Sequence, residues 1–252
     1  MIASVFGHAW GLYRKHFGVI AAVVIVIWLP LNLLANYRAY FVYGPDDFEA
    51  NFRFSQWLQK FVGIIATAGV ISIGYTSHLG QHPTFGGSMN VGINSYGRMW
   101  WTNFLTQLAI LLGVILLVIP GIYLLVRLAF TEQVAVCERV YGVAAMRRSF
   151  ELTERRFWQV FLLQLVVMAM GVAAGVCVCL PTVLIPQMDW VVDAAISLFA
   201  DFVFAYGTLC MLSAYLCLSQ NRDTAELADE PTGGSAAAAA NLVIEEGPLS
   251  VS

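Results

Sequence analysis

Charged residues are scarce in this chain. They make up 12% of its 252 residues, whereas 59% of the residues are hydrophobic. Soluble globular domains carry about 25% charged and about 45–50% apolar residues. Charge is absent altogether between Arg98 and Arg127 and between Arg156 and Asp189. Because about 20 apolar residues suffice to cross a bilayer, the composition excludes an ordinary soluble domain and indicates a membrane protein.

Motifs for catalysis, metals and cofactors are also missing. The sequence has no serine elbow, glycine-rich phosphate loop or H-E-x-x-H motif. His78 and His82 have a spacing that zinc sites use, but no third ligand is evident and Pro83 ends the segment. With 13 basic and 16 acidic residues, the chain also lacks the basic patch of a nucleic-acid-binding protein. We therefore expect no enzymatic activity, no cofactor, no metal and no nucleic-acid partner.

The cysteines exclude a disulfide framework. There are five of them, an odd number, and all lie in apolar runs without the C-x-x-C spacing of a zinc site. We interpret them as small apolar packing residues; they are Cys137, Cys177, Cys179, Cys210 and Cys217.

Long apolar runs define six predicted transmembrane helices. The run from Trp101 to Cys137 is too long for one crossing, and Pro120-Gly121 is the natural place to divide it, because proline removes a backbone donor and glycine accepts a left-handed turn. We expect an all-α polytopic membrane protein with three helical hairpins and cytoplasmic amphipathic helices. The predicted spans are Phe17–Ala35, Phe61–Leu79, Trp101–Ile119, Gly121–Cys137, Trp158–Leu180 and Trp190–Leu218.

The distribution of Lys and Arg predicts the orientation. With the N-terminus inside, the inner segments carry nine of these residues and the outer segments three. Cytoplasmic loops are enriched in Lys and Arg, so we expect a multi-pass protein of the inner (cytoplasmic) membrane with both termini cytoplasmic. Residues 1–220 form the predicted membrane domain, and residues 221–252 form a predicted disordered, acidic cytoplasmic tail.

The segment from Gly142 to Phe157 predicts an amphipathic inner helix. Val143, Met146, Phe150 and Phe157 lie on one stripe at helical spacing. Such a helix either lies in the headgroup plane, with its arginines near anionic lipid phosphates, or connects two spans beneath the bundle with its charges solvated. The candidate residues for headgroup contact are Arg147, Arg148, Arg155 and Arg156.

One block of the sequence resembles a known family. It carries in order Pro120-Gly121-Ile122-Tyr123, Arg127-Leu128-Ala129-Phe130, Glu138, the run from Ala145 to Thr153, and Phe157-Trp158. This order resembles the membrane domain attached to some glycerophosphodiester phosphodiesterases, and related bacterial six-helix membrane proteins of unknown function. The resemblance covers roughly residues 1–218 and implies a six-helix membrane domain. Glu132-Gln133 departs from the mostly apolar family pattern. No phosphodiesterase domain is attached, so hydrolysis is not carried over.

Four charged residues fall inside the predicted spans, where charge is costly and marks candidate sites. At 1.5 Å per residue, Arg127 lies about 9 Å from the outer ends of the helices, Asp193 about 5 Å, and Glu132 and Asp201 both about 16 Å. Arg127 pairing with Asp193 or Asp201 would lock two hairpins together. Alternatively, Glu132 and Asp201 would form a proton- or cation-binding carboxylate pair.

These features predict a function only in outline. We expect a non-enzymatic integral membrane protein with a lipid-interacting or scaffolding role. Its partners would be membrane lipids, and other membrane proteins or further copies of the chain are alternatives. The alternative function is a small transporter coupled to protons or cations through its buried carboxylates.

Overall fold

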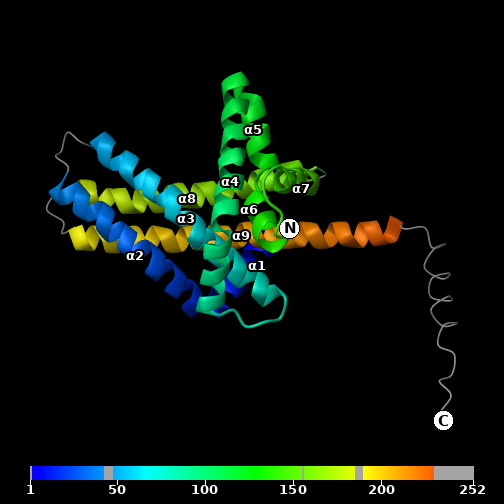
Figure 1. Ribbon diagram of the computed structural model, residues 1–252, viewed down its shortest axis with the longest axis horizontal. Helices are drawn as coiled ribbons and strands as arrows, with labels where there is room; N and C mark the ends of the chain where they lie inside the picture. The colour runs from blue at the N-terminus through cyan, green and yellow to red at the C-terminus, as the bar shows by residue number, and fades with distance from the viewer. Residues whose placement is uncertain (1, 43–47, 155, 185–189, 230–252) are drawn as a thin grey trace, which may run out of the picture.

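The computed structural model describes residues 2–42, 48–154, 156–184 and 190–229. These residues form helices and include no strand, which confirms the all-α prediction. Figure 1 shows their arrangement. The helices are α1 (Ile2–Lys15), α2 (Phe17–Phe41), α3 (Phe48–His78), α4 (Phe85–Leu116), α5 (Val118–Arg127), α6 (Thr131–Cys137), α7 (Val143–Thr153), α8 (Phe157–Leu184) and α9 (Trp190–Asp229).

Six segments in the described part of the chain are long and apolar enough to cross a membrane, as predicted. Five are helices or parts of helices, and the fourth joins α5 to α6 across a turn. Consecutive pairs α2 and α3, α4 and α5, and α8 and α9 are in contact, but α2 also packs along α9. The segments are Phe17–Phe41, Lys60–His78, Phe85–Leu116, Val118–Cys137, Phe157–Val178 and Trp190–Gln220.

The turn between α4 and α5 lies earlier than predicted. Leu117, with extended φ and ψ, separates the two helices, and Pro120 lies in the first turn of α5. Proline is tolerated there because the first N–H groups of a helix have no intrahelical acceptor. Gly121 instead permits close packing, since a Cβ on it would lie 2.9 Å from the Cα and backbone N of Val114. The prediction that Pro120-Gly121 form the break was therefore wrong by one helical turn.

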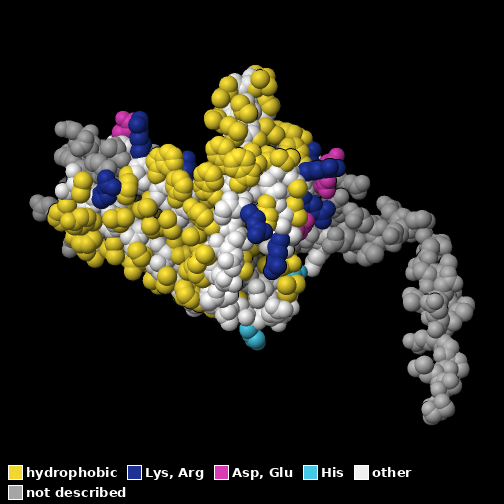
Figure 2. Space-filling view, viewed as in Figure 1, with side chains coloured by type: hydrophobic (Ala, Val, Ile, Leu, Met, Phe, Trp, Pro, Cys, Tyr) yellow, Lys and Arg dark blue, Asp and Glu magenta, His cyan; other side chains and the backbone are white. Residues whose placement is uncertain are grey.

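The α4–α5 hairpin lies crosswise to the other long helices. In Figure 1, α8 and α9 run along the long axis and α2 and α3 run obliquely to it, whereas α4 and α5 cross that direction and project away from the bundle. Figure 2 shows that hydrophobic side chains cover the projecting part. The side chains at the tip, residues 115–119, are apolar and exposed, as is typical of a surface that contacts lipid or another apolar partner.

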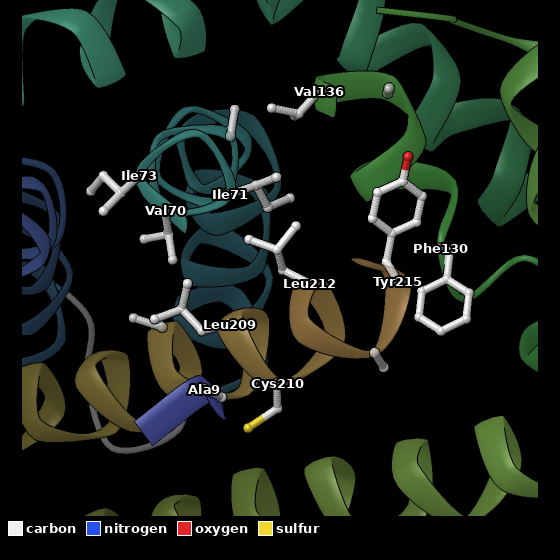
Figure 3. Packing of buried hydrophobic residues seen from close by; sticks show 14 of the residues in the cluster. Ala9, Val70, Ile71, Ile73, Phe130, Val136, Leu209, Cys210, Leu212 and Tyr215 are labelled. Atoms are coloured by element: carbon white, nitrogen blue, oxygen red, sulfur yellow. The ribbon is translucent and has the colours of Figure 1, made fainter. Parts of the chain in front are cut away.

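The core forms where α3 packs against α9. Ile71 and Ile73 of α3 and Leu209 and Leu212 of α9 are almost completely buried. Figure 3 shows Ile71 facing Leu212 and Val70 facing Leu209 between the two helices, whereas Ile73 points to another side of α3. Gly74 lies at this contact, because a Cβ there would collide with the side chains of Leu209 and Leu212. Dispersion contacts and small residues stabilise such packing where the surroundings are lipid.

The predicted tail begins inside the last helix. Helix α9 continues to Asp229, past the predicted boundary at residue 221. Residues 230–252, which make up the rest of the predicted tail, lie outside the described residues.

Candidate functional site

Arg127 does not pair with either aspartate of α9. Its Nε donates a 2.8 Å hydrogen bond to Tyr123 Oη, and its Nη1 donates one of 3.0 Å to the carbonyl oxygen of Phe150 in α7. The guanidinium also lies over the rings of Tyr123 and Phe150, 5.1 and 5.6 Å from their centroids. Among the described residues no ion pair joins Arg127 to Asp193 or Asp201. The predicted interhelical salt bridge was therefore wrong.

A turn at residues 128–130 explains the difference. Helix α5 ends at Arg127, whose carbonyl oxygen accepts a 2.8 Å hydrogen bond from Ser149 Oγ. The same hydroxyl accepts a 3.2 Å bond from the backbone N–H of Phe130. We call residues 127–131 the elbow. These hydrogen bonds hold the elbow against α7, and the chain turns there between α5 and α6. The membrane depths predicted for Arg127 and Glu132 assumed one straight helix and therefore do not apply.

Asp201 and Asp193 have partners on α2. Asn32 Nδ2 donates a 2.7 Å hydrogen bond to Asp201 Oδ2, and Tyr40 hydrogen-bonds to Asp193. Glu132 lies on α6 and accepts from Asn103 instead. The structure does not bring Glu132 and Asp201 to a common site, so the predicted network of Arg127, Glu132, Asp193 and Asp201 is divided among separate places.

Glu132 lines a polar cavity at the base of the hairpin. The cavity has a volume of about 270 Å³ and lies between α4, the elbow, α6 and α8. Asn103 Nδ2 donates a 3.1 Å hydrogen bond to Glu132 Oε1. We call it the Glu132 cavity; its lining residues are Met99, Thr102, Asn103, Thr106, Gln107, Ile110, Leu125, Leu128, Ala129, Thr131, Glu132, Ala135 and Gln164.

The threonine hydroxyls of this cavity already donate to the backbone. Thr102 donates to the carbonyl of Arg98, Thr106 to that of Thr102, and Thr131 to that of Leu128. Thr102 Oγ1 also accepts a 2.7 Å hydrogen bond from the N–H of Gly142, the N-cap of α7. The bond from Gly142 joins α4 to the start of α7. Because the three hydroxyls have given their protons to backbone carbonyls, they can act only as acceptors toward the cavity.

Sequence reasoning missed the amide residues of the Glu132 cavity. Asn103, Gln107 and Gln164 lie inside charge-free apolar runs, so a search for formal charges does not find them. The signal was present in the spacing, because Asn103 and Gln107 are four residues apart on one helix face. Gln164 lies on α8, and only the packing of that helix brings it to the same cavity.

Arg148 forms ion pairs within the protein, with Glu138 and Glu151. Its Nε lies 3.2 Å from Glu138 Oε2, and Tyr215 Oη donates a 2.8 Å hydrogen bond to Glu138 Oε1. Its side chain is 28% exposed, and headgroup contact by this residue stays a prediction. Arg147, by contrast, is 83% exposed and pairs with Glu151 at 3.4 Å.

Two further arginines, Arg155 and Arg156, were predicted to contact headgroups. Arg156 is half-buried, and Arg155 lies outside the described residues.

Helix α7 buries Ala145, Ser149, Leu152 and Thr153, whereas Val143 of the predicted stripe is 70% exposed. Met146, Phe150 and Phe157 of that stripe are half-buried, and the side of α7 that meets the membrane stays a prediction.

The described residues include no group of three or more His, Cys, Asp or Glu side chains arranged to hold a metal ion. Comparison with curated proteins and with solved structures gave no match. One family model matches residues 50–216, which include the hairpin, the Glu132 cavity, α7 and most of α9. Since this match covers well over half of the chain, the protein belongs to the family described as Domain of unknown function (DUF7847).

Proposed function

We propose that this protein is a non-enzymatic, lipid-interacting component of the cytoplasmic membrane, with its α4–α5 hairpin embedded in the leaflet nearest α7. The observation that carries this proposal is the exposure of the hairpin tip. Its side chains are 62–79% exposed and all apolar, without a polar residue among them; they are Ile115, Leu116, Leu117, Val118 and Ile119.

The length of α5 supports embedding without a full crossing. Its 10 residues extend about 15 Å, half of a hydrocarbon core about 30 Å thick. At its end, Arg127 is bonded to α7, the helix that carries Arg147 and Arg148. In Figure 1 the hairpin runs crosswise to α8 and α9, so with those two helices across the membrane it lies largely along the membrane plane. The tip therefore lies among acyl chains and does not reach the opposite aqueous phase.

The enrichment of Lys and Arg in the inner segments supports an orientation with α7 and both termini on the cytoplasmic side. Arg147, 83% exposed, is then the described α7 arginine best placed to meet anionic headgroups, which attract basic residues near the membrane surface.

Site-directed labelling tests the embedded hairpin. In full-length protein with its native cysteines replaced by alanine, Ile119→Cys is treated in sealed vesicles with a membrane-impermeant maleimide from either side. We expect no labelling from either side and full labelling after solubilisation. Gln81→Cys and Glu49→Cys serve as controls, because both positions are exposed, at opposite ends of α3. Labelling of Ile119→Cys from the side on which Glu49→Cys reacts would mean that the hairpin crosses the membrane.

A further inference from the structure

The Glu132 cavity offers hydrogen-bond acceptors that lack donors. Gln164 Oε1 is buried and has no hydrogen-bond partner among the described residues. The three threonine hydroxyls have already donated their protons to backbone carbonyls. Glu132, an acceptor through both oxygens when ionised, receives one hydrogen bond from Asn103. A ligand that supplies several N–H groups would satisfy this site.

The cavity also lacks a counter-charge for Glu132. None of its lining residues is Lys or Arg, and Arg127, the nearest cation along the chain, is bonded to Tyr123 and Phe150. Burying an uncompensated carboxylate is costly, because the low-dielectric surroundings do not replace its hydration. A cation that also donates hydrogen bonds would offset this cost.

The position of the cavity favours a lipid as the source of that cation. Ile110 and Leu125 line it, and the adjoining hairpin surface is apolar, with Leu111 and Leu112 54% and 57% exposed. On another side, the hydrogen bond from Gly142 to Thr102 joins the cavity wall to the start of α7. A polar pocket thus lies between an acyl-chain surface and the helix proposed to lie nearest the headgroups.

We propose that the Glu132 cavity binds the primary ammonium group of a phospholipid headgroup, with the acyl chains of that lipid on the α4–α5 hairpin. This assignment rests on the proposed lipid-interacting function and names the lipid class. A primary ammonium has three donors and no acceptor, which matches Glu132 together with Gln164 Oε1. A quaternary ammonium has the charge but no N–H group, and a glycerol headgroup lacks the positive charge.

Competition among lipids tests the site. The full-length protein is incubated with an equal mixture of phosphatidylethanolamine, phosphatidylcholine and phosphatidylglycerol with identical chains, and bound lipid is counted by native mass spectrometry. We expect about a tenfold preference for phosphatidylethanolamine over phosphatidylcholine, since a hydrogen bond to a charged group contributes at least that factor. Glu132→Gln should abolish the preference, and Gln164→Leu should reduce it.

Asp201→Asn is the matched control, because Asp201 lies on α9 with Asn32 as its partner; this variant should keep the wild-type preference. Equal binding of the three lipids by the wild type, or an unchanged preference in well-folded Glu132→Gln protein, would overturn the proposal. Free ethanolamine separates the two sources of a primary ammonium. If it displaces the lipid at an equal concentration, the ligand is a soluble amine and the lipid assignment is wrong. Labelling of the hairpin tip reports separately on the embedded hairpin, so failure of one proposal is distinguishable from failure of the other.

Discussion

The side-chain amide of Asn32 donates a 2.7 Å hydrogen bond to the carboxylate of Asp201 and so joins α2 to α9. Asn32 is buried, with 9% of its surface exposed. Inside a membrane bundle, such a contact satisfies two polar groups that lipid cannot satisfy. It assigns Asp201 a structural role between the second and the last helix.

Removing this contact should destabilise the bundle. We expect Asn32→Ala to lower the free energy of unfolding by about 1–3 kcal/mol, because the carboxylate of Asp201 loses its donor while remaining largely in apolar surroundings. Thermal unfolding in detergent measures the loss. The exchanged pair Asn32→Asp with Asp201→Asn should recover most of the stability, and a double variant as unstable as Asn32→Ala would contradict this role for the pair.

Close packing of the α4–α5 hairpin should depend on Gly121. A methyl group there meets the backbone of Val114 at 2.9 Å, so we expect Gly121→Ala to cost about 1–3 kcal/mol through overpacking. Gly171→Ala is the matched control, because no atom lies within 4 Å of the Cβ position there. Equal unfolding temperatures for the two variants would show that the helices of the hairpin do not pack this closely.

Arg148 and Arg147 should differ sharply in their effect on stability. Arg148 is partly buried against Glu138, which also binds Tyr215. Arg148→Gln leaves the carboxylate of Glu138 without its cation and should lower the free energy of unfolding by about 1–3 kcal/mol. Arg147→Gln should change stability by less than about 0.5 kcal/mol, since exposed ion pairs contribute little. Chemical or thermal unfolding of both variants checks the difference, and a larger loss for Arg147→Gln would be inconsistent with the observed cluster.

His16 should make stability depend on pH. Its Nε2 lies 2.8 Å from Ser77 Oγ. Burial is the main cause that lowers the pKa of His16 below its ordinary value of 6.5, and the charges of Lys15 and His82 lower it further. The unfolded chain therefore binds a proton more readily than the folded protein does. The protein therefore has its full stability above the ordinary pKa of histidine, and it loses stability as the pH falls through the lowered pKa of His16 in the folded state.

Thermal unfolding across that range measures this effect. The wild type should unfold at a lower temperature near pH 5 than near pH 7.5, and His16→Gln should reduce the difference. The expectation fails if the variant and the wild type show the same pH dependence.

Apolar run lengths were enough to predict the helical class and the six membrane-length segments. The same counting failed within the fourth segment, because a run of apolar residues looks continuous whether or not the chain turns at residues 128–130. It also missed Asn103, Gln107 and Gln164, whose importance comes from meeting in one cavity. No pattern along α4 indicates that α8 will supply the third amide.

The sequence by itself determined that this protein is helical, that it belongs in a membrane and that basic residues gather in alternate connecting segments, because these properties depend on composition and on position along the chain. The tertiary structure alone decided the partners of the charged residues. Position along a helix does not fix the direction in which the next element leaves. The turn at the elbow and its packing on α7 place Arg127 beside Tyr123 and Phe150, so that it bonds to these residues and not to an aspartate.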